Sequence, residues 1–267
     1  MIWNRLTVFV AQKLNSWTTL INAPPSIDEK ARNVLIVQCH PSKDSYNTQL
    51  ADAVARGLLT GGHTVKLRRL YHYDEDGSIQ GRLSIRSYAN KDTKCILATL
   101  SSSGKTAYHS PEHTKDRDEK KEASLSVPAD IKEAVADLLW CDSLVFVYPT
   151  WWFNFPAALK GYLDRVFLPG IAFRLPDNNE ESVLGGTGLV PLLGHIAKIG
   201  AVTTFGASQT VVAYAGDNSR RFLSRGLRAL CARECGMSYH ALYESTVCTA
   251  EKRREFLAEV EEYYSHF

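Results

Sequence analysis

The sequence lacks the features that mark several special classes of protein. No apolar run approaches the roughly 20 residues that a helix needs to span a bilayer. The charge is nearly balanced, with 31 lysines and arginines against 29 aspartates and glutamates, and the two signs are mixed along the chain. This balance argues against nucleic acid as the main partner. Repeats of solenoid length are also absent, which excludes repeat arrays and propellers.

The six cysteines lack the spacing of a disulfide or metal motif. None forms a C-x-x-C pair, and several lie in apolar runs where a thiol behaves as a small buried hydrophobe. Cys231 and Cys235 lie on an expected helix with His240 beyond them, but a zinc site would need a fourth ligand. We therefore expect no metal site and a reduced, intracellular protein in the cytoplasm.

Residues 1–27 differ in composition from the rest of the chain. They contain Arg5 and Lys13 but no acidic residue, and their apolar side chains form one helical stripe. This pattern resembles an organelle transit peptide or an amphipathic anchor, and the alternative is a docking helix or a disordered tail. We interpret residues 1–31 as an N-terminal extension. It leaves open a mitochondrial location and a peripheral membrane or organelle contact through residues 1–27.

From residue 32 onward, apolar runs typical of strands alternate with segments of helical period. The expected strands are 34–37, 64–70, 143–148, 198–204 and 238–243, and the expected helices are 47–59, 131–139, 156–167, 218–235 and 250–267. Because right-handed crossovers place helices on both faces of a parallel sheet, we predict one doubly wound α/β domain over residues 32–267. Its sheet should have five parallel strands.

Residues 74–127 interrupt this alternation. They mix acidic residues, a Ser-Ser-Ser-Gly stretch and the charge run 115–122 with only short apolar islands. We interpret the segment as an insertion, either a solvated loop or a lid over a ligand.

The loop after the first expected strand has the residues of an anion site. Ser45 and Asn47 are favoured at helix N-caps, and the N–H groups at a helix start favour a phosphate. His40 stands at the end of the strand and could donate to the same phosphate. The alternative is an ordinary N-cap with an incidental histidine. Neither a G-x-G-x-x-G nor a P-loop fingerprint is present, which argues against the usual dinucleotide and nucleoside triphosphate sites.

The loop after the third expected strand is the most distinctive part of the chain. Pro149 is expected to lead the backbone out of the sheet, and Trp151, Trp152 and Phe153 follow before the helix at Pro156. Large flat side chains in such a loop suit a planar ligand, and loop N–H groups are available to a ring that needs hydrogen bonds. A plug of the hydrophobic core is the alternative.

A third loop, at 203–208, also leaves a strand at its carboxyl end. Thr203 and Thr204 offer hydroxyl groups there, and Gly206 adds a permissive backbone. In an open α/β sheet the ligand binds outside the carboxyl ends of the strands. We therefore expect the three loops to converge on one crevice.

These segments together resemble one known family. The strings HP followed by SYN, YPTWWFNFPAALKGYLDRVF, GIAF and VTTFG are similar to motifs of the flavodoxin-like NAD(P)H:quinone oxidoreductases. This family includes the bacterial modulator-of-drug-activity and potassium-efflux ancillary reductases. The resemblance covers roughly residues 33–73 and 128–245, and the second string carries most of it.

The resemblance implies a flavin, FAD or FMN, bound without a covalent bond, and NAD(P)H as co-substrate. The cofactor-binding residues that it implies are His40, Ser45, Tyr46 and Asn47 near the phosphate, Pro149, Thr150, Trp151, Trp152 and Phe153 along the ring, and Thr203, Thr204, Phe205 and Gly206 at the opposite edge. Phe173 and Trp152 are implied in the substrate pocket. The nicotinamide would pass a hydride to the flavin and leave, and a quinone would then take its place.

The chain departs from the family pattern around the third loop. Relatives carry a Tyr and a His after this turn that are thought to manage protons, whereas here Tyr214 alone is a catalytic candidate. Phe205 replaces a Gly of the family motif, which adds bulk beside the expected flavin edge. Phe173 stands where the family often has a Tyr.

Relatives are commonly homodimers with active sites at the interface, so the resemblance also implies a homodimer. Trp152, Phe155 and Tyr162 are its expected surface residues. The leading hypothesis is an NAD(P)H-dependent flavoprotein that reduces quinones or similar small electrophiles by two-electron transfer. The alternatives are a nitro, azo or flavin reductase of the same fold, a flavin-binding regulatory or electron-carrier protein with little turnover, and a fold relative that has lost its cofactor.

Overall fold

The computed structural model describes residues 30–71, 129–175 and 189–267. Nearly all of the predicted N-terminal extension and the whole predicted insertion at 74–127 lie outside these residues. Within the three described ranges, no helix is both long and apolar enough to cross a membrane.

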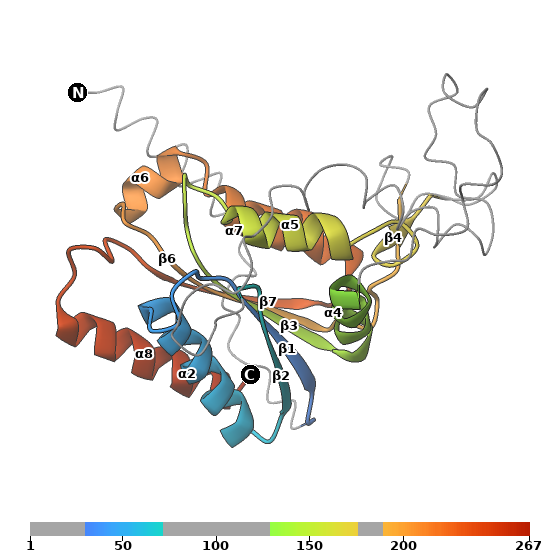
Figure 1. Cartoon of the computed structure of the whole chain (residues 1–267), viewed down its shortest axis with the longest axis horizontal. Helices are drawn as coiled ribbons and strands as arrows, with labels where there is room; N and C mark the ends of the chain where they lie inside the picture. The colour runs from blue at the N-terminus through green and yellow to red at the C-terminus, as the bar shows by residue number, and fades with distance from the viewer. Residues whose placement is uncertain (1–29, 72–128, 176–188) are drawn as a thin grey trace.

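A five-stranded sheet forms the centre of the fold (Figure 1). Its strands are β1 (Asn33–Gln38), β2 (Thr64–Arg69), β3 (Ser143–Pro149), β6 (Lys198–Thr204) and β7 (Gly236–Leu242). They lie in the order β2-β1-β3-β6-β7, and every neighbouring pair is parallel. The predicted doubly wound α/β fold with five parallel strands is therefore confirmed.

Burial explains the place of each strand in the sheet. Every residue of β3 is buried, as expected for a central strand covered on both faces. In contrast, β2 has exposed and half-buried residues and carries Lys66 and Arg68, which suits the edge strand that the sequence predicts. Asp137 of α4 (Ala129–Trp140) accepts hydrogen bonds from both of these cations and ties the edge strand to a helix.

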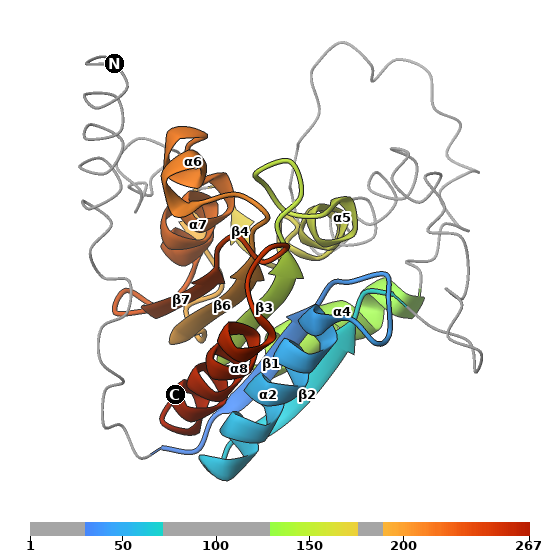
Figure 2. The same cartoon turned by 90° about the vertical axis from the view of Figure 1, so that its left-hand side faces the viewer.

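Helices cover both faces of the sheet (Figures 1 and 2). On one face, α2 (Tyr46–Thr60) and α8 (Ala250–Ser265) pack against inward residues such as Val145. On the other face, α4 and α5 (Ala157–Val166) pack against residues such as Phe146. Neighbouring residues of one strand thus belong to opposite cores, as the pleat requires.

The helix predicted at 218–235 is the main correction to the predicted elements. The structure has α7 (Asn218–Arg221), a π-helical turn (Phe222–Leu227) and a 3-10 turn (Arg228–Leu230). The helical path ends there because Leu193 N–H donates to Leu230 O and Cys231 is drawn into a bridge with Leu193. Cys231 and Cys235 therefore do not share a helix, and Phe222, predicted to face inward, is exposed.

Three short elements have no sequence prediction. They are α6 (Gln209–Tyr214), β4 (Phe173–Arg174) and β5 (Val190–Pro191), and the two strands form an antiparallel hairpin. Each is too short to show a period in the sequence.

The two helices α2 and α8 approach each other closely at two glycines. A β-carbon on Gly57 would collide with the carbonyl oxygen of Glu261 and lie 3.0 Å from Tyr264 Cβ. A β-carbon on Gly61 would lie 2.6 Å from the carbonyl oxygen of Ser265. The close contact between these helices therefore depends on the missing side chains.

We predict that Gly57→Ala destabilises the fold by about 1–2 kcal/mol. The colliding atom is a backbone oxygen that cannot rotate away, so the added methyl group would push α8 from α2 and outweigh the better helix propensity of alanine. Chemical denaturation measures the free energy of unfolding. Gly194→Ala is the matched control because nothing lies within 4 Å of a β-carbon there. Equal losses in the two variants would contradict the prediction.

Candidate functional site

Three loops leave the carboxyl ends of the neighbouring strands β1, β3 and β6 at one edge of the sheet (Figure 2). Backbone hydrogen bonds hold the first residues of these loops side by side. Cys39 N–H donates to Val147 O at 2.9 Å, and Thr150 N–H donates to Thr204 O at 2.8 Å. The winding of the chain reverses between β1 and β3, and such a switch point is where open α/β sheets bind ligands. The three loops therefore start at the same edge of the sheet, as predicted.

The β1–α2 loop leads into a capped helix. Ser45 is the N-cap residue of α2, and its hydroxyl oxygen accepts a hydrogen bond from Thr48 N–H at 3.1 Å. The side-chain oxygens of Ser45 and Thr48 also hydrogen-bond each other at 2.9 Å. Since the first N–H groups of a helix have no partner inside it, this end of α2 can hold a phosphate or another anion.

His40 stands at the end of β1 beside this helix start. It is half-buried, and its Nδ1 accepts a hydrogen bond from Ser42 N–H at 3.0 Å. Burial lowers the pKa of His40, so its ring is neutral at neutral pH. Nδ1 also lies 3.2 Å from Ser42 O, so it accepts from Ser42 N–H in one tautomer and donates to Ser42 O in the other.

Tyr46 and Asn47 use their polar groups within the protein. The Tyr46 hydroxyl donates to the carbonyl oxygen of Arg253 at 2.7 Å, and burial raises the pKa of Tyr46 to about 12. Asn47 is buried, and its amide oxygen accepts a hydrogen bond from Gln38 Nε2 at 3.1 Å. Both polar groups therefore hold the start of α2 in place.

The β3–α5 loop contains a tight turn built from aromatic residues. Trp151 and Asn154 exchange two backbone hydrogen bonds of 3.1 and 3.0 Å, so Trp152 and Phe153 are its central residues. Both have positive φ, 50° and 57°, a conformation that favours Gly and Asn and costs other residues about 1–2 kcal/mol each. Strain of this kind persists only where the surroundings impose it, and it clusters at ligand sites.

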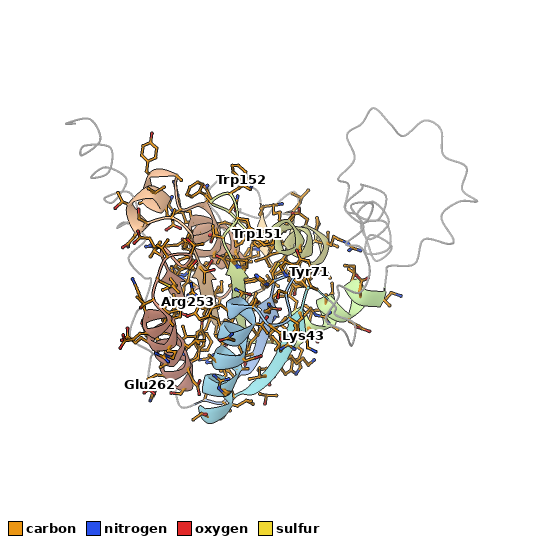
Figure 3. All side chains as sticks on the ribbon, turned by 60° about the vertical axis from the view of Figure 1, so that its left-hand side comes forward. Lys43, Tyr71, Trp151, Trp152, Arg253 and Glu262 are labelled. Carbon is orange, nitrogen blue, oxygen red and sulfur yellow. The ribbon has the colours of Figure 1, made fainter. Side chains whose placement is uncertain are left out.

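The turn presents the Trp152 ring outward (Figure 3). Trp152 is 95% exposed and Trp151 is 40% exposed, which excludes the alternative that both rings plug the core. Among the residues that the structure describes, the N–H groups of Trp152 and Phe153 donate to no backbone carbonyl. Two rings and two N–H groups are thus available to a planar ligand with hydrogen-bonding atoms.

Pro149 does not lead the backbone out of the sheet, contrary to the sequence prediction. It is the last residue of β3 and lies opposite the half-buried Thr204 in the register with β6. A proline is tolerated at this position because β1, on the other side, has already ended and offers no regular ladder bond.

The loop after β6 supplies a hydroxyl group and an uncrowded glycine. Thr203 is buried, and its hydroxyl lies 2.9 Å from the Thr150 hydroxyl of the neighbouring loop. A β-carbon on Gly206 would lie in ordinary contact with Thr246 Cγ2 at 3.8 Å, so the backbone at Gly206 is not crowded. The ring of Phe205 is buried and stacks on Tyr243 with 5.1 Å between centroids. Phe205 therefore contributes its bulk to the core, not to the exposed edge.

The structure separates the other residues that the sequence singles out. Tyr214 ends α6 and is 67% exposed to solvent. Phe173 packs against the core, whereas Trp152 is almost fully exposed. Tyr162 is buried, so its predicted place on a dimer surface is wrong, and Phe155 is half-buried.

One contact that the sequence does not signal ties α7 to the aromatic turn. The side-chain amide of Asn218 donates to the carbonyl oxygens of Phe153 at 3.5 Å and Ala215 at 3.4 Å. Asn218 lies in a short polar stretch after Gly216 that looks like any surface turn. Only the folded chain shows that this stretch reaches the β3–α5 loop.

The three loops together fit a ligand with a planar ring and an anionic tail. The start of α2 and the His40 ring suit the anion, and the aromatic turn suits the ring. Gly206 lies at the same edge of the sheet and is not crowded by its neighbours. These are the donor groups that a flavin phosphate and a flavin ring require.

Comparison with known proteins agrees with this geometry. A sequence family described by a flavodoxin-like fold matches residues 32–267. The ribosyldihydronicotinamide dehydrogenase-like protein traD of Penicillium crustosum is 30% identical over 148 residues, which are 55% of this chain and 48% of that protein. The human ribosyldihydronicotinamide dehydrogenase (quinone) is 29% identical over 155 residues, 58% of this chain and 59% of that protein. The chain thus spans about half the length of the curated relatives that it matches.

Solved structures share the fold at low sequence identity. The NAD(P)H:quinone oxidoreductase of Methanothermobacter marburgensis has a TM-score of 0.56 and 21% identity, and the match covers 88% of this chain and 96% of that one. An FMN-dependent NADH-azoreductase of Bacillus anthracis, solved in complex with FMN, has a TM-score of 0.57 and 17% identity over 87% of this chain and 97% of that one.

We predict that Ser45→Ala lowers the affinity for FMN or FAD about fivefold and destabilises the fold by about 1 kcal/mol. The variant loses the hydroxyl that orders the first turn of α2, where the phosphate would bind. Fluorescence titration with each flavin and chemical denaturation measure the two effects.

Thr249→Ala is the matched control because it removes a cap of the same kind from α8. The Thr249 hydroxyl oxygen accepts a hydrogen bond from Lys252 N–H at 3.2 Å. This variant should lose a similar amount of stability and keep its flavin affinity. Equal losses of affinity in both variants would show that Ser45 acts through stability alone.

Proposed function

Because the chain belongs to the family with a flavodoxin-like fold, we propose that it is a flavin-dependent NAD(P)H oxidoreductase that reduces quinones or similar small electrophiles. Two matched relatives are named as ribosyldihydronicotinamide dehydrogenases or proteins like them, and one matched structure is an NAD(P)H:quinone oxidoreductase. Their names support the reaction class, and the site of this chain supplies the physical argument.

The observation that carries the proposal is the strained aromatic turn beside a capped helix start. A core-packing role does not explain why Trp152 and Phe153 adopt positive φ. It also does not explain why the preceding Trp151 is left partly exposed. A planar cofactor does, because it gains from exposed indole rings and from backbone N–H groups at the same edge. The start of α2 follows β1, the strand next to β3, so it lies at the same sheet edge and can hold the phosphate tail.

In the proposed complex the residues have separate tasks. The phosphate binds at the N–H groups of the first turn of α2, with Ser45 ordering that turn and His40 donating from the side. The ring lies along the turn that contains Trp151, Trp152 and Phe153. Thr150 borders the ring from the start of the same loop, and Gly206 borders it from the loop after β6.

A bound flavin supplies hydride chemistry, which none of the side chains at this edge can perform. The chain orients the rings on Trp151 and Trp152, so that a nicotinamide and then an acceptor can occupy the same face in turn. The N–H groups of the aromatic turn offer fixed dipoles to the charge that develops on reduction. The paired hydroxyls of Thr150 and Thr203 can hold or pass a proton beside the ring.

A flavin-binding electron carrier with little turnover is the second candidate. One observation favours it. Tyr214, the catalytic candidate from the sequence, is 67% exposed, so its hydroxyl is not held against the aromatic turn. The two candidates differ in whether a pyridine nucleotide reduces the bound flavin.

We also propose that two copies of the chain pair through this edge. Trp152, Tyr214 and Phe222 are exposed apolar side chains, and Asn218 links α7 and the end of α6 to the aromatic turn, so they share one region. Exposed aromatic groups gathered in this way are typical of protein interfaces. A second copy would also complete a substrate site that one chain leaves open beside Trp152.

We predict that the purified chain binds FMN or FAD and that NADPH or NADH bleaches the bound flavin without oxygen present. Absorbance spectra recorded before and after the nucleotide is added measure both steps. Flavin that binds but stays oxidised would favour the electron carrier. A failure to bind either flavin would overturn both candidates.

We predict that Trp152→Ala lowers flavin affinity or the rate of flavin reduction about tenfold, because a stacking surface worth about 1.4 kcal/mol is lost. Trp152→Phe keeps a flat ring and is the conservative control. Stopped-flow absorbance with a saturating nucleotide measures the reduction rate, and titration measures the affinity. Equal behaviour of the alanine and phenylalanine variants would argue against stacking.

We predict that Tyr214→Arg converts the dimer to a monomer, because two buried cations would face each other across the interface. Leu59→Arg is the matched control, since Leu59 is 60% exposed but lies on α2. Sedimentation velocity measures the state of each. A wild-type monomer, or a Tyr214→Arg dimer, would contradict the proposed interface.

A further inference from the structure

A group of buried polar side chains lies beneath the aromatic turn. Its members are Tyr148 on β3, Thr203 on β6, Tyr239 on β7, and Asp217 and Ser219 at the start of α7. All five are buried, and Asp217 is only 4% exposed. We call this group the polar cluster. The proposed function does not use it, apart from Thr203.

The sheet register brings the cluster to the ligand edge. Tyr148 and Thr203 are direct partners on the neighbouring strands β3 and β6, so their side chains point to the same face. The Thr203 hydroxyl lies 2.9 Å from the Thr150 hydroxyl, which belongs to the loop of the aromatic turn. The ring of Phe155 covers Tyr148 edge-on, with 5.1 Å between centroids.

Asp217 closes the cluster at its other end. It adopts a left-handed backbone conformation with φ 46°, which is uncommon outside glycine. One carboxylate oxygen lies 3.5 Å from Arg220 Nη1, and the other is buried with no hydrogen-bond partner among the described residues. The next residue, Asn218, holds the aromatic turn through Phe153 O.

Two further hydroxyl groups in the cluster are buried and meet the distance and angle criteria of a hydrogen bond with no group in the described part of the chain. They are those of Tyr148 and Ser219. The hydroxyls of Ser219, Tyr239 and Thr203 nevertheless lie close enough to the Tyr148 hydroxyl to influence its pKa. Buried polar groups left in this state oppose folding, so packing alone does not account for three of them in one place.

Burial of Asp217 favours the protonated form of its carboxyl group. Burial raises the pKa of Asp217, and the nearby Arg220 and Arg221 oppose this effect. The tyrosines that face it are Tyr148, Tyr239 and Tyr243; burial raises the pKa of each, and the negative charge of Asp217 raises it further.

We propose that Asp217, Ser219, Tyr148 and Thr203 form a proton relay that ends at the Thr150 hydroxyl and supplies the proton taken up when the acceptor is reduced. The proposal rests on the proposed function, because it assumes hydride transfer at this edge. Tyr148 and Asp217 act through Thr150 and are therefore positioning and relay residues.

Reduction of a quinone to a hydroquinone needs one hydride, which carries both electrons from the flavin, and one proton. The Thr150 O–H bond breaks as its proton passes to the oxygen of the acceptor, and Thr150 takes a proton from Thr203. Each hydroxyl behind it gives one proton and receives one, and the carboxyl O–H of Asp217 breaks last. Arg220 then compensates the carboxylate until water returns the proton.

Tyr148→Phe tests the relay because it removes one hydroxyl and keeps the ring. Tyr162→Phe is the matched control: Tyr162 is also a buried tyrosine in the same core, but it lies on α5, outside the polar cluster. The flavin of each protein is first reduced with nucleotide and then mixed with menadione, a quinone, or with ferricyanide, which takes up electrons and no proton.

We expect Tyr148→Phe to slow reoxidation by menadione about tenfold or more, with a changed pH profile and solvent isotope effect. Reduction by nucleotide, reoxidation by ferricyanide and every step of Tyr162→Phe should match the wild type. If Tyr148→Phe also matches the wild type with menadione, the relay is overturned while the proposed function stands. If the wild-type chain binds no flavin, or its flavin stays oxidised, the proposed function fails and the relay fails with it.

Asp217→Asn gives a readout that needs no flavin. Since the pKa of Asp217 is raised above its ordinary value of 3.8, the folded state holds the proton more tightly than the unfolded state. The stability of the wild type should therefore fall as the pH rises through 3.8 toward the folded value, and this loss should vanish in Asp217→Asn. Denaturation midpoints of the flavin-free proteins against pH measure it. Identical pH dependence in the two proteins would exclude Asp217 as the proton donor.

Discussion

Parallel pairing of β1, β3 and β6 is the constraint on which the rest of the structure depends. The hydrogen bonds between these strands bring their three carboxyl ends side by side. Two further backbone hydrogen bonds, donated by Cys39 N–H and Thr150 N–H, hold the first residues of the loops together. A slip of one residue would turn every buried side chain of β3 to the opposite face, so the apolar cores on both sides hold the register. The same register places Tyr148 beside Thr203.

The aromatic turn is strained, and its neighbours support it. Its own two backbone hydrogen bonds close the turn, Asn218 holds Phe153 O from α7, and Phe155 anchors the following segment between Tyr148 and Phe222. Support from three directions lets two bulky residues remain in a conformation that glycine usually occupies. These contacts hold the turn in one conformation while its rings face solvent, and a preformed surface of this kind suits the binding of flat molecules.

Buried strands were predictable because their apolar runs are continuous, and α2 was predictable because its period and its cap at Ser45 agree. The path after Leu227 was not, because pairing with Leu193 overrides local helical preference. The candidate ring-binding residues were predictable as a group, from aromatic residues in a loop after a buried strand. Their conformation was not, since no local rule places Trp152 and Phe153 at positive φ.

The sequence by itself determined the fold class, the order of the elements and the three loops at one sheet edge, because periodicity and buried runs are local properties of a chain. Only the tertiary structure decided which side chains reach that edge. It buried Phe205 against Tyr243 and Tyr162 within the core, left Trp152 in solvent, and gathered Asp217, Tyr148 and Thr203. These positions depend on contacts between residues distant in the chain, and a local pattern carries no information about such contacts.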